Sequence, residues 1–120
     1  MDKKKAHNKK ANQLRLENIM ANCIGTEHYY TNPVLCYRYT DGVKTFAIEA
    51  GAYWFLSELN PFIYKLKRFS SFKLKVGGNK GEILIDDQPK KKISFTDCPD
   101  GEWEFFFEPE ANLLMWNMEY

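Results

Sequence analysis

The stretch "FKLKV", residues 72–76, alternates apolar and charged side chains at every step. Phe72, Leu74 and Val76 fall on one side of an extended chain and the two lysines on the other, because successive side chains of a strand point to opposite faces. The stretch therefore predicts a strand whose sheet is buried on one face only. The glycines of "GGNKG", at residues 77–81, predict that a hairpin turn follows.

Similar strand-like runs follow in the C-terminal third of the chain. They are "EILID" at 82–86, "KISFT" at 92–96, "EWEFFFE" at 102–108 and "LLMWNM" at 113–118. In each run one parity is apolar, which predicts that its residues face the core: Ile83, Ile85, Ile93, Phe95, Trp103, Phe105, Phe107, Leu114, Trp116 and Met118. The opposite, outer face is expected to carry Lys73, Lys75, Leu84, Ser94, Thr96, Glu104, Phe106 and Met115.

Two helices are predicted before these strands. Apolar residues recur at near-helical spacing between Lys9 and Asn22, and Gly25 is expected to end that helix. In "AIEAGAYWFLSELN", residues 47–60, one helical face holds Ile48, Ala52, Phe55, Leu56 and Leu59. Gly51 inside this helix suggests that another backbone passes close by, and Asn60-Pro61 predicts its end.

The stretch "VLCYRYTDGVKTFAI", residues 34–48, sets two β-rich runs on either side of Asp41-Gly42. Asp-Gly suits the positive φ angles of a tight turn, so the stretch predicts a β-hairpin.

Together these elements predict an α+β fold. The sheet is expected to be antiparallel, with about five to seven strands, and to be packed on one face by two helices. A chain of 120 residues is the size of one domain. We expect residues 1–10 to form a flexible basic arm and residues 11–120 to form a single α+β domain.

The net charge of +1 hides a strong segregation of charge along the chain. Residues 61–92 hold nine basic and three acidic side chains, whereas residues 93–120 hold seven acidic and no basic ones. Such asymmetry can steer a charged partner. It can equally reflect a basic strand that pairs with an acidic strand in the same sheet.

Several classes of protein are excluded by composition. No run of apolar residues is long enough to span a membrane, and Arg15 and Glu17 interrupt the region where a signal peptide would be apolar. The three cysteines form neither a disulfide framework nor a zinc pair, so we expect a cytoplasmic location. Two histidines, His7 and His28, share no ligand spacing with a cysteine, and we expect no metal and no cofactor.

The motif "GTEHYY", residues 25–30, is the one stretch that could carry catalysis. Glu27 could orient His28, and Tyr30 could supply a phenol, so a small enzyme centred on Glu27, His28 and Tyr30 is an alternative hypothesis. Consecutive side chains point in different directions, however, which favours a structural role for the motif. We therefore predict that the protein is not an enzyme.

The pattern "TEHYY", then "TDGV", then "EAGAYW", with a terminal "EY", resembles an uncharacterised family of small bacterial and phage proteins, a domain of unknown function. The resemblance spans roughly residues 20–120 and implies a context of phages and mobile elements without a mechanism. The acidic segment "PDGEWEFFFEPEAN" and the basic "QPKKK" depart from the family's pattern. A function carried by those segments is therefore expected to be particular to this protein.

The leading hypothesis is a non-enzymatic interaction protein, associated with a phage or mobile element, that binds a host protein or ribonucleoprotein complex. An inhibitor of a defence nuclease, similar to an anti-CRISPR protein, is its concrete form. The alternative is a nucleic-acid-binding protein that uses the basic arm and the basic segment 65–92. The candidate partner-binding residues are Tyr64, Lys65, Lys67, Arg68, Lys73, Lys75, Lys90, Lys91, Lys92 and Phe106. Phe69 is a further aromatic residue available for stacking.

Overall fold

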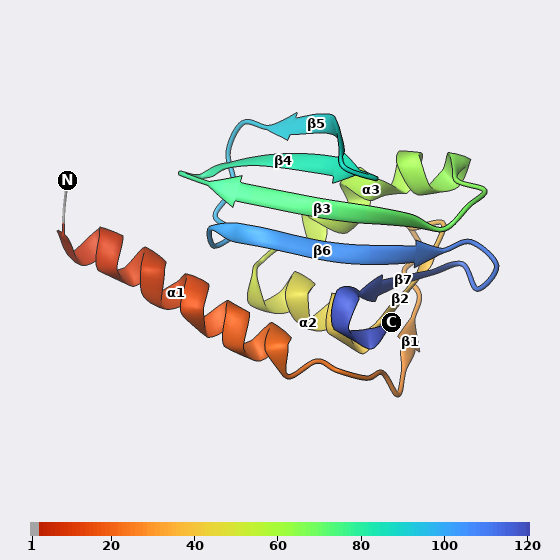
Figure 1. The fold of residues 1–120 in the computed structure, drawn as a ribbon, viewed down its shortest axis with the longest axis horizontal. Coiled ribbons are helices and arrows are strands. Elements are labelled where there is room, and N and C mark those ends of the chain that lie inside the picture. The colour runs from red at the N-terminus through yellow and green to blue at the C-terminus, as the bar shows by residue number, and fades with distance from the viewer. Residues whose placement is uncertain (1–2) are drawn as a thin grey trace.

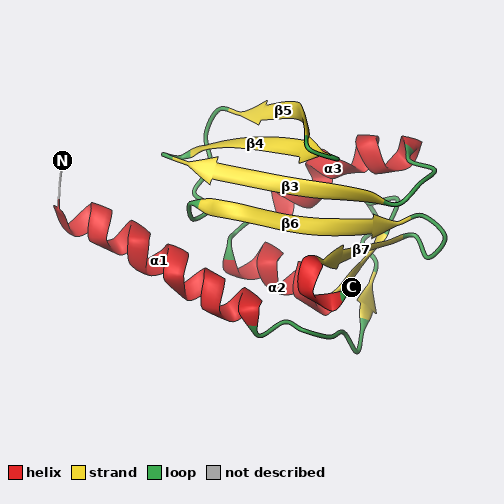
Figure 2. Ribbon diagram, viewed as in Figure 1, coloured by secondary structure: helices red, strands yellow, loops and turns green. Residues whose placement is uncertain are grey.

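The computed structural model describes residues 3–120, with side chains from Lys10 onward. Helices and strands alternate early in the chain, and strands dominate after residue 70 (Figure 2). The elements in order are α1 (Lys3–Ala21), β1 (Tyr29–Tyr30), β2 (Arg38–Thr40), α2 (Asp41–Glu49), α3 (Tyr53–Lys65), β3 (Ser70–Gly77), β4 (Lys80–Ile85), β5 (Gln88–Ile93), β6 (Gly101–Glu108), β7 (Leu113–Trp116) and the 3-10 turn η1 (Asn117–Glu119).

The strands form one sheet in the order β1-β2-β7-β6-β3-β4-β5. Each neighbouring pair is antiparallel except β2 and β7, which are parallel. Figure 1 shows α3 partly behind β3 and β4, α2 below β6, and α1 along the lower side of the molecule. The predicted α+β class is confirmed, and the described residues form three α-helices rather than two.

The core lies between the sheet and α2 and α3. Phe46 of α2 is fully buried, and its ring contacts Phe55 of α3 and Phe105 of β6 at centroid distances of 6.1 and 5.1 Å. In the sheet, Phe72 pairs with Phe105 and Leu74 pairs with Trp103, so alternate residues of β3 and β6 face the helices. The face expected from "FKLKV" is confirmed.

The first helix is longer than expected. It begins at Lys3 and not at Lys9, so the residues predicted to form an arm continue the helix, while Met1 and Asp2 lie outside the described residues. Lysine and alanine are good helix formers, and the segment contains no glycine or proline. The predicted flexibility of residues 1–10 stays a prediction.

The hairpin predicted at Asp41-Gly42 is wrong, because Asp41 begins α2. Thr40 is the N-cap residue, and its hydroxyl accepts a hydrogen bond from the Val43 N–H. Thr-Asp-Gly can start a helix as well as a turn. Val43, Phe46 and Ala47 then bury one helical face, which decides the outcome.

The helix predicted over residues 47–60 is two helices. Gly51 has a φ of +61° and separates α2 from α3, and a β-carbon there would meet no atom within 4 Å, so no backbone passes close by. Ile48, expected in the core, is exposed as a consequence. The end predicted at Asn60-Pro61 is also wrong, because α3 continues to Lys65 and buries Ile63 against the core beyond the proline.

The strand predicted at residues 92–96 lies earlier, at Gln88–Ile93. Asp86 and Asp87 both have positive φ and form a two-residue turn, since Ile85 pairs with Gln88. β5 is the last strand of the sheet, and such edge strands tolerate proline and lysine. Phe95 therefore lies beyond the strand and is exposed instead of buried.

Two further residues depart from the expected faces. Met118, expected in the core, lies in η1 and is exposed. Thr96, expected on the outer face, is buried in a loop, where its hydroxyl accepts a hydrogen bond from the Cys98 N–H. Neither residue belongs to a strand, so the alternation rule does not apply to them.

Within the described residues, no helix is both long enough and apolar enough to cross a membrane.

Candidate functional site

The motif "GTEHYY" folds around the carboxylate of Asp41, at the N-terminus of α2. The Tyr30 hydroxyl donates to Asp41 Oδ1 at 2.7 Å, and the backbone N–H groups of Glu27 and His28 donate to Oδ2 at 2.8 and 3.1 Å. The Thr26 hydroxyl accepts from the Asp41 N–H at 3.1 Å. We call these five residues, Thr26, Glu27, His28, Tyr30 and Asp41, the α2 clamp.

The α2 clamp changes the ionisation of its members. The hydrogen bond from Tyr30, followed by those from the two backbone N–H groups, lowers the pKa of Asp41 to about 2. The same bond raises the pKa of the Tyr30 hydroxyl, because it stabilises the protonated phenol. Asp41 therefore holds its negative charge at the positive end of the helix dipole at neutral pH.

The residues of the enzyme hypothesis are only partly brought together. His28 Nδ1 lies 3.7 Å from Asp41 Oδ1. The carboxylate next to the imidazole is therefore Asp41, whereas the sequence suggested Glu27. Most of the His28 side chain is exposed. Each contact of the clamp ties the β1 segment to α2, which is the structural role favoured from the sequence.

A second carboxylate, Glu119, caps α2 from the C-terminus of the chain. It accepts hydrogen bonds from the Thr40 hydroxyl at 2.6 Å, the Gly42 N–H at 3.0 Å and the Trp116 N–H at 2.9 Å. The N-terminus of α2 is thus held by Asp41 and Glu119 together.

An aromatic cluster lies on the face of the sheet opposite α2 and α3. Phe106 alternates with the buried Phe105 and Phe107, so its side chain points to this outer face. Its ring centroid lies 5.5 Å from that of Phe69 and 5.5 Å from that of Tyr120. Phe69 and Tyr120 contact each other at 5.2 Å and are 40% and 78% exposed. We call Phe69, Phe106 and Tyr120 the sheet-face cluster.

The lysines of β3 are paired on the same outer face. Lys73 and Lys75 both lie within 3.9 Å of Glu102 on β6, and Lys73 also lies 3.8 Å from Asp87. In the register of the sheet, Lys73 faces Glu104 and Lys75 faces Glu102. The expected pairing of a basic strand with an acidic strand is therefore present, and both lysines have a carboxylate partner within the protein.

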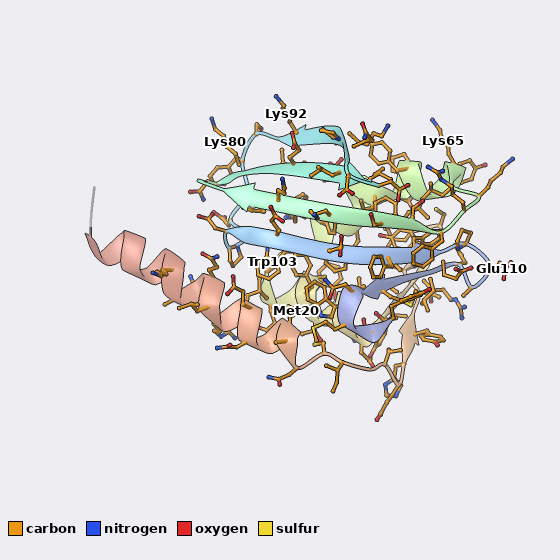
Figure 3. The ribbon with its side chains drawn as sticks, in the orientation of Figure 1. Met20, Lys65, Lys80, Lys92, Trp103 and Glu110 are labelled. Atoms are coloured by element: carbon orange, nitrogen blue, oxygen red, sulfur yellow. The ribbon has the colours of Figure 1, made fainter. Side chains whose placement is uncertain are left out.

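Other predicted basic residues lie on the β5 side of the molecule, and Lys65, Arg68 and Lys90 meet there. Lys65 and Lys92 both project from the upper side of the structure in Figure 3. Between α3 and β5 lies a hollow of about 280 Å³, which we call the α3–β5 pocket. Its lining combines apolar and charged side chains: Phe62, Lys65, Leu66, Arg68, Ile85, Asp86, Gln88 and Lys90. Three of these residues are cationic, and one is anionic.

The remaining candidates are dispersed. Lys91 does not line the α3–β5 pocket and forms an ion pair with Glu58 of α3. Tyr64 is 80% exposed and lines a separate hollow with Cys36 and Pro109, so it does not join the sheet-face cluster. Lys67 lies in the loop between α3 and β3. Tyr120 was missed from the sequence, because a terminal residue gives no periodic signal for its position.

Two absences are established within the described part of the chain. No three His, Cys, Asp or Glu side chains there are arranged to hold a metal ion. No buried side-chain nitrogen or oxygen among those residues lacks a hydrogen-bond partner.

Comparison with known proteins identifies one family. The model of a family of unknown function (DUF6876) matches residues 14–120. No curated protein and no solved structure shows significant similarity to the chain.

Proposed function

The chain belongs to that family of unknown function, and we propose that the protein is a non-enzymatic interaction protein that binds a host protein complex through the outer face of its sheet. The observation that carries this proposal is the sheet-face cluster. Three aromatic rings contact one another on a face that α2 and α3 leave uncovered. Aromatic side chains of this kind supply much of the binding energy at protein interfaces.

The charges around the sheet-face cluster favour a protein partner. Glu104 and Glu108 lie on the same strand as Phe106, and neither has an ion pair recorded among the described residues. Glu102 of that strand is shared by Lys73 and Lys75 of the neighbouring strand. Nucleic acid would meet carboxylates on this face and would be repelled. A folded protein with an apolar patch and basic surroundings fits better.

In its concrete form, the partner is a host defence nuclease, such as a CRISPR effector, in the setting of a phage or mobile element. A small protein that acts by occupying a surface needs no catalytic group. This form is tested by mixing the purified protein with a panel of such effectors and looking for co-elution. Failure across the panel removes the concrete form.

The experiment for the general proposal compares two double variants in affinity capture from the native host, with and without nuclease treatment. Phe69→Ala with Tyr120→Ala removes the two most exposed rings of the sheet-face cluster. Tyr64→Ala with Phe95→Ala removes one tyrosine and one phenylalanine that are 80% and 65% exposed elsewhere, and serves as the matched control. Any captured complex is then reconstituted from purified components.

We expect the cluster variant to bind the reconstituted complex at least about tenfold more weakly, because two central aromatic anchors that cost about 1 kcal/mol or more each together exceed the roughly 1.4 kcal/mol of a tenfold change. The control variant should bind as the unmodified protein does, and nuclease should leave capture intact. Equal binding by the two variants would contradict the proposal.

A second candidate function, direct nucleic-acid binding, is favoured by one observation. Lys65, Arg68 and Lys90 meet at the α3–β5 pocket with only Asp86 opposing them. Binding of this kind must weaken steeply with salt, and nuclease treatment must release the captured material. These two results separate it from the first proposal.

A further inference from the structure

The outer edge of β5 is open. β5 ends the sheet, and no strand of the described chain lies beyond it. Of its six residues, Gln88 to Lys92 are exposed and only Ile93 is partly covered. In an edge strand, part of the backbone N–H and C=O groups point outward, where they bond either to water or to an added strand.

The charge of this edge selects its neighbour. β5 carries three lysines and no acid, and of these only Lys91 has an ion pair recorded among the described residues. Two copies of this edge would bring lysines against lysines, which disfavours self-association. An acidic strand would bring carboxylates to Lys90 and Lys92. The sheet already uses this arrangement where β3 meets the acidic β6.

The α3–β5 pocket adjoins the same edge and offers a place for a side chain. Its apolar part comes from Phe62, Leu66 and Ile85, and its charged part from Lys65, Arg68 and Lys90. Arg68 lies 3.4 Å from Asp86, whereas Lys65 and Lys90 have no ion pair recorded within the described residues. The pocket therefore suits an apolar side chain that is flanked by carboxylates.

We propose that an extended acidic segment of the partner protein adds to β5 as a further strand and places an apolar side chain in the α3–β5 pocket. Outward-facing backbone groups of β5 on either side of Pro89, which has no N–H, and of the irregular register at Lys90 would supply hydrogen bonds, and the pocket and lysines would supply specificity. This inference rests on the proposed function, because it names the chemistry of one segment of the protein partner.

The competing occupant is single-stranded nucleic acid, whose phosphates would use the same lysines. A phosphate chain cannot continue the hydrogen-bond ladder of β5 in the way a peptide backbone does, and it has no apolar side chain for the pocket. Protection of the β5 backbone amides is therefore the readout that separates the two.

The probe is a synthetic peptide of about seven residues, the length of an ordinary strand, with alternating glutamate and leucine and blocked ends. It is added to the full chain at low salt. Binding is followed by fluorescence anisotropy, and hydrogen exchange of the β5 amides is followed by NMR. A peptide with lysine for glutamate, a peptide with serine for leucine, and a thymidine oligonucleotide of equal length are the comparison probes.

We expect the acidic peptide to bind and to slow exchange of β5 amides by about tenfold or more, since amides gain protection when a new strand bonds to them. The lysine and serine peptides should bind at least about tenfold more weakly, because they lack the charge or the apolar group. Absence of β5 protection, or equal binding of the serine peptide, would overturn the inference. If the oligonucleotide displaces the peptide and binds more tightly, the inference is wrong and the β5 edge is a nucleic-acid site instead.

A pair of matched variants locates the peptide. Lys65→Gln with Lys90→Gln removes two charges from the α3–β5 pocket, and Lys10→Gln with Lys80→Gln removes two exposed charges elsewhere. Figure 3 places Lys80 at the opposite end of the sheet from Lys65. Only the pocket variant should weaken peptide binding, by about tenfold. Equal weakening by both variants would show nonspecific attraction and refute the site.

Failure of this inference is distinguishable from failure of the proposed function. If the pocket variant captures the host complex normally and the peptide does not bind, the inference fails while the interaction function stands. If the peptide binds as described but the sheet-face cluster variant captures its complex normally, the edge site stands and the proposed docking face fails.

Discussion

Replacing Asp41 with asparagine should lower the free energy of unfolding at neutral pH and reduce the further decrease of that free energy in acid. The Asp41 carboxylate accepts hydrogen bonds from Tyr30 and from two backbone N–H groups and sits at the first residue of α2. An asparagine keeps the shape but loses the charge, and its amide nitrogen cannot accept a hydrogen bond. The α2 clamp would therefore lose part of its hold on the β1 segment.

The magnitude follows from the pKa of Asp41. A fall from the ordinary value of 3.8 to about 2 corresponds to about 2 kcal/mol of stability while the group is ionised. The side chain is about a third exposed, and solvent screening reduces the expected loss in Asp41→Asn to about 1 kcal/mol. For a domain of this size, 1 kcal/mol lowers the Tm by about 4 °C.

The sign of the pH dependence is fixed by the direction of the shift. Because the folded-state pKa is lower than the unfolded-state pKa, the contribution is fully present well above 3.8 and is lost as the pH falls toward 2. At pH 6, Asp41→Asn should therefore be less stable than the unmodified protein by about 1 kcal/mol. This difference in the free energy of unfolding should shrink toward pH 2.

Urea denaturation, followed by tryptophan fluorescence at a series of pH values, measures this difference. The exposed Asp97→Asn serves as the control and should match the unmodified protein across the range. Tyr30→Phe removes the main cause of the low pKa, so it should raise the pKa of Asp41 and reproduce part of the loss. A stability difference between Asp41→Asn and the unmodified protein that stays constant from pH 6 to pH 2 would refute the reasoning.

Three further outcomes are expected from the described structure. Gly42→Ala should destabilise the protein by about 1–3 kcal/mol in urea denaturation, since its β-carbon would collide with side chains of the C-terminal segment and overpacking outweighs the roughly 1 kcal/mol of added helix propensity. Phe105→Ala should cost about 3–5 kcal/mol, and Phe106→Ala about 1 kcal/mol, because only the former leaves a core cavity; equal losses would contradict the assigned faces. Burial raises the pKa of the Cys98 thiol to about 12, so a thiol reagent at pH 8 should modify the exposed Cys36 in the folded protein and Cys98 only after unfolding.

The part of the fold that could be predicted from sequence is the part with a local repeat. The strict alternation of "FKLKV" placed Phe72 in the core, and the shared parity of Trp103, Phe105 and Phe107 in "EWEFFFE" placed Phe105 in the core and Phe106 outside. Both rules rest on the period of a strand, which is a local property. The same rule failed at residues 92–96, where an edge strand accepts lysine and proline that a central strand would exclude. The bounds of this strand depend on its position at the edge of the sheet, which is a tertiary property.

The contacts of the candidate sites could not be predicted, because their partners are far apart in sequence. Glu119 bonds to Thr40 across 79 positions, and Tyr30 bonds to Asp41 across 11. No spacing rule links such residues. Asp41 also illustrates an ambiguity of local signals, since Asp-Gly begins turns and helices alike. The burial of Val43, Phe46 and Ala47 against the core selects the helix.

The motifs that carry the family resemblance meet around α2. "TEHYY" supplies the clamp, "TDGV" supplies the cap and first turn, Gly51 of "EAGAYW" ends the helix, and Glu119 of the terminal "EY" closes its N-terminus. Each of these contacts helps to hold α2 in the fold. The segments expected to depart from the pattern, "QPKKK" and "PDGEWEFFFEPEAN", contain most of the β5 edge and the strand β6, which carries Phe106 on the outer sheet face. Those are the two surfaces where partner binding is proposed, so differences in partner are expected to reside there while α2 and its caps hold the sheet in place.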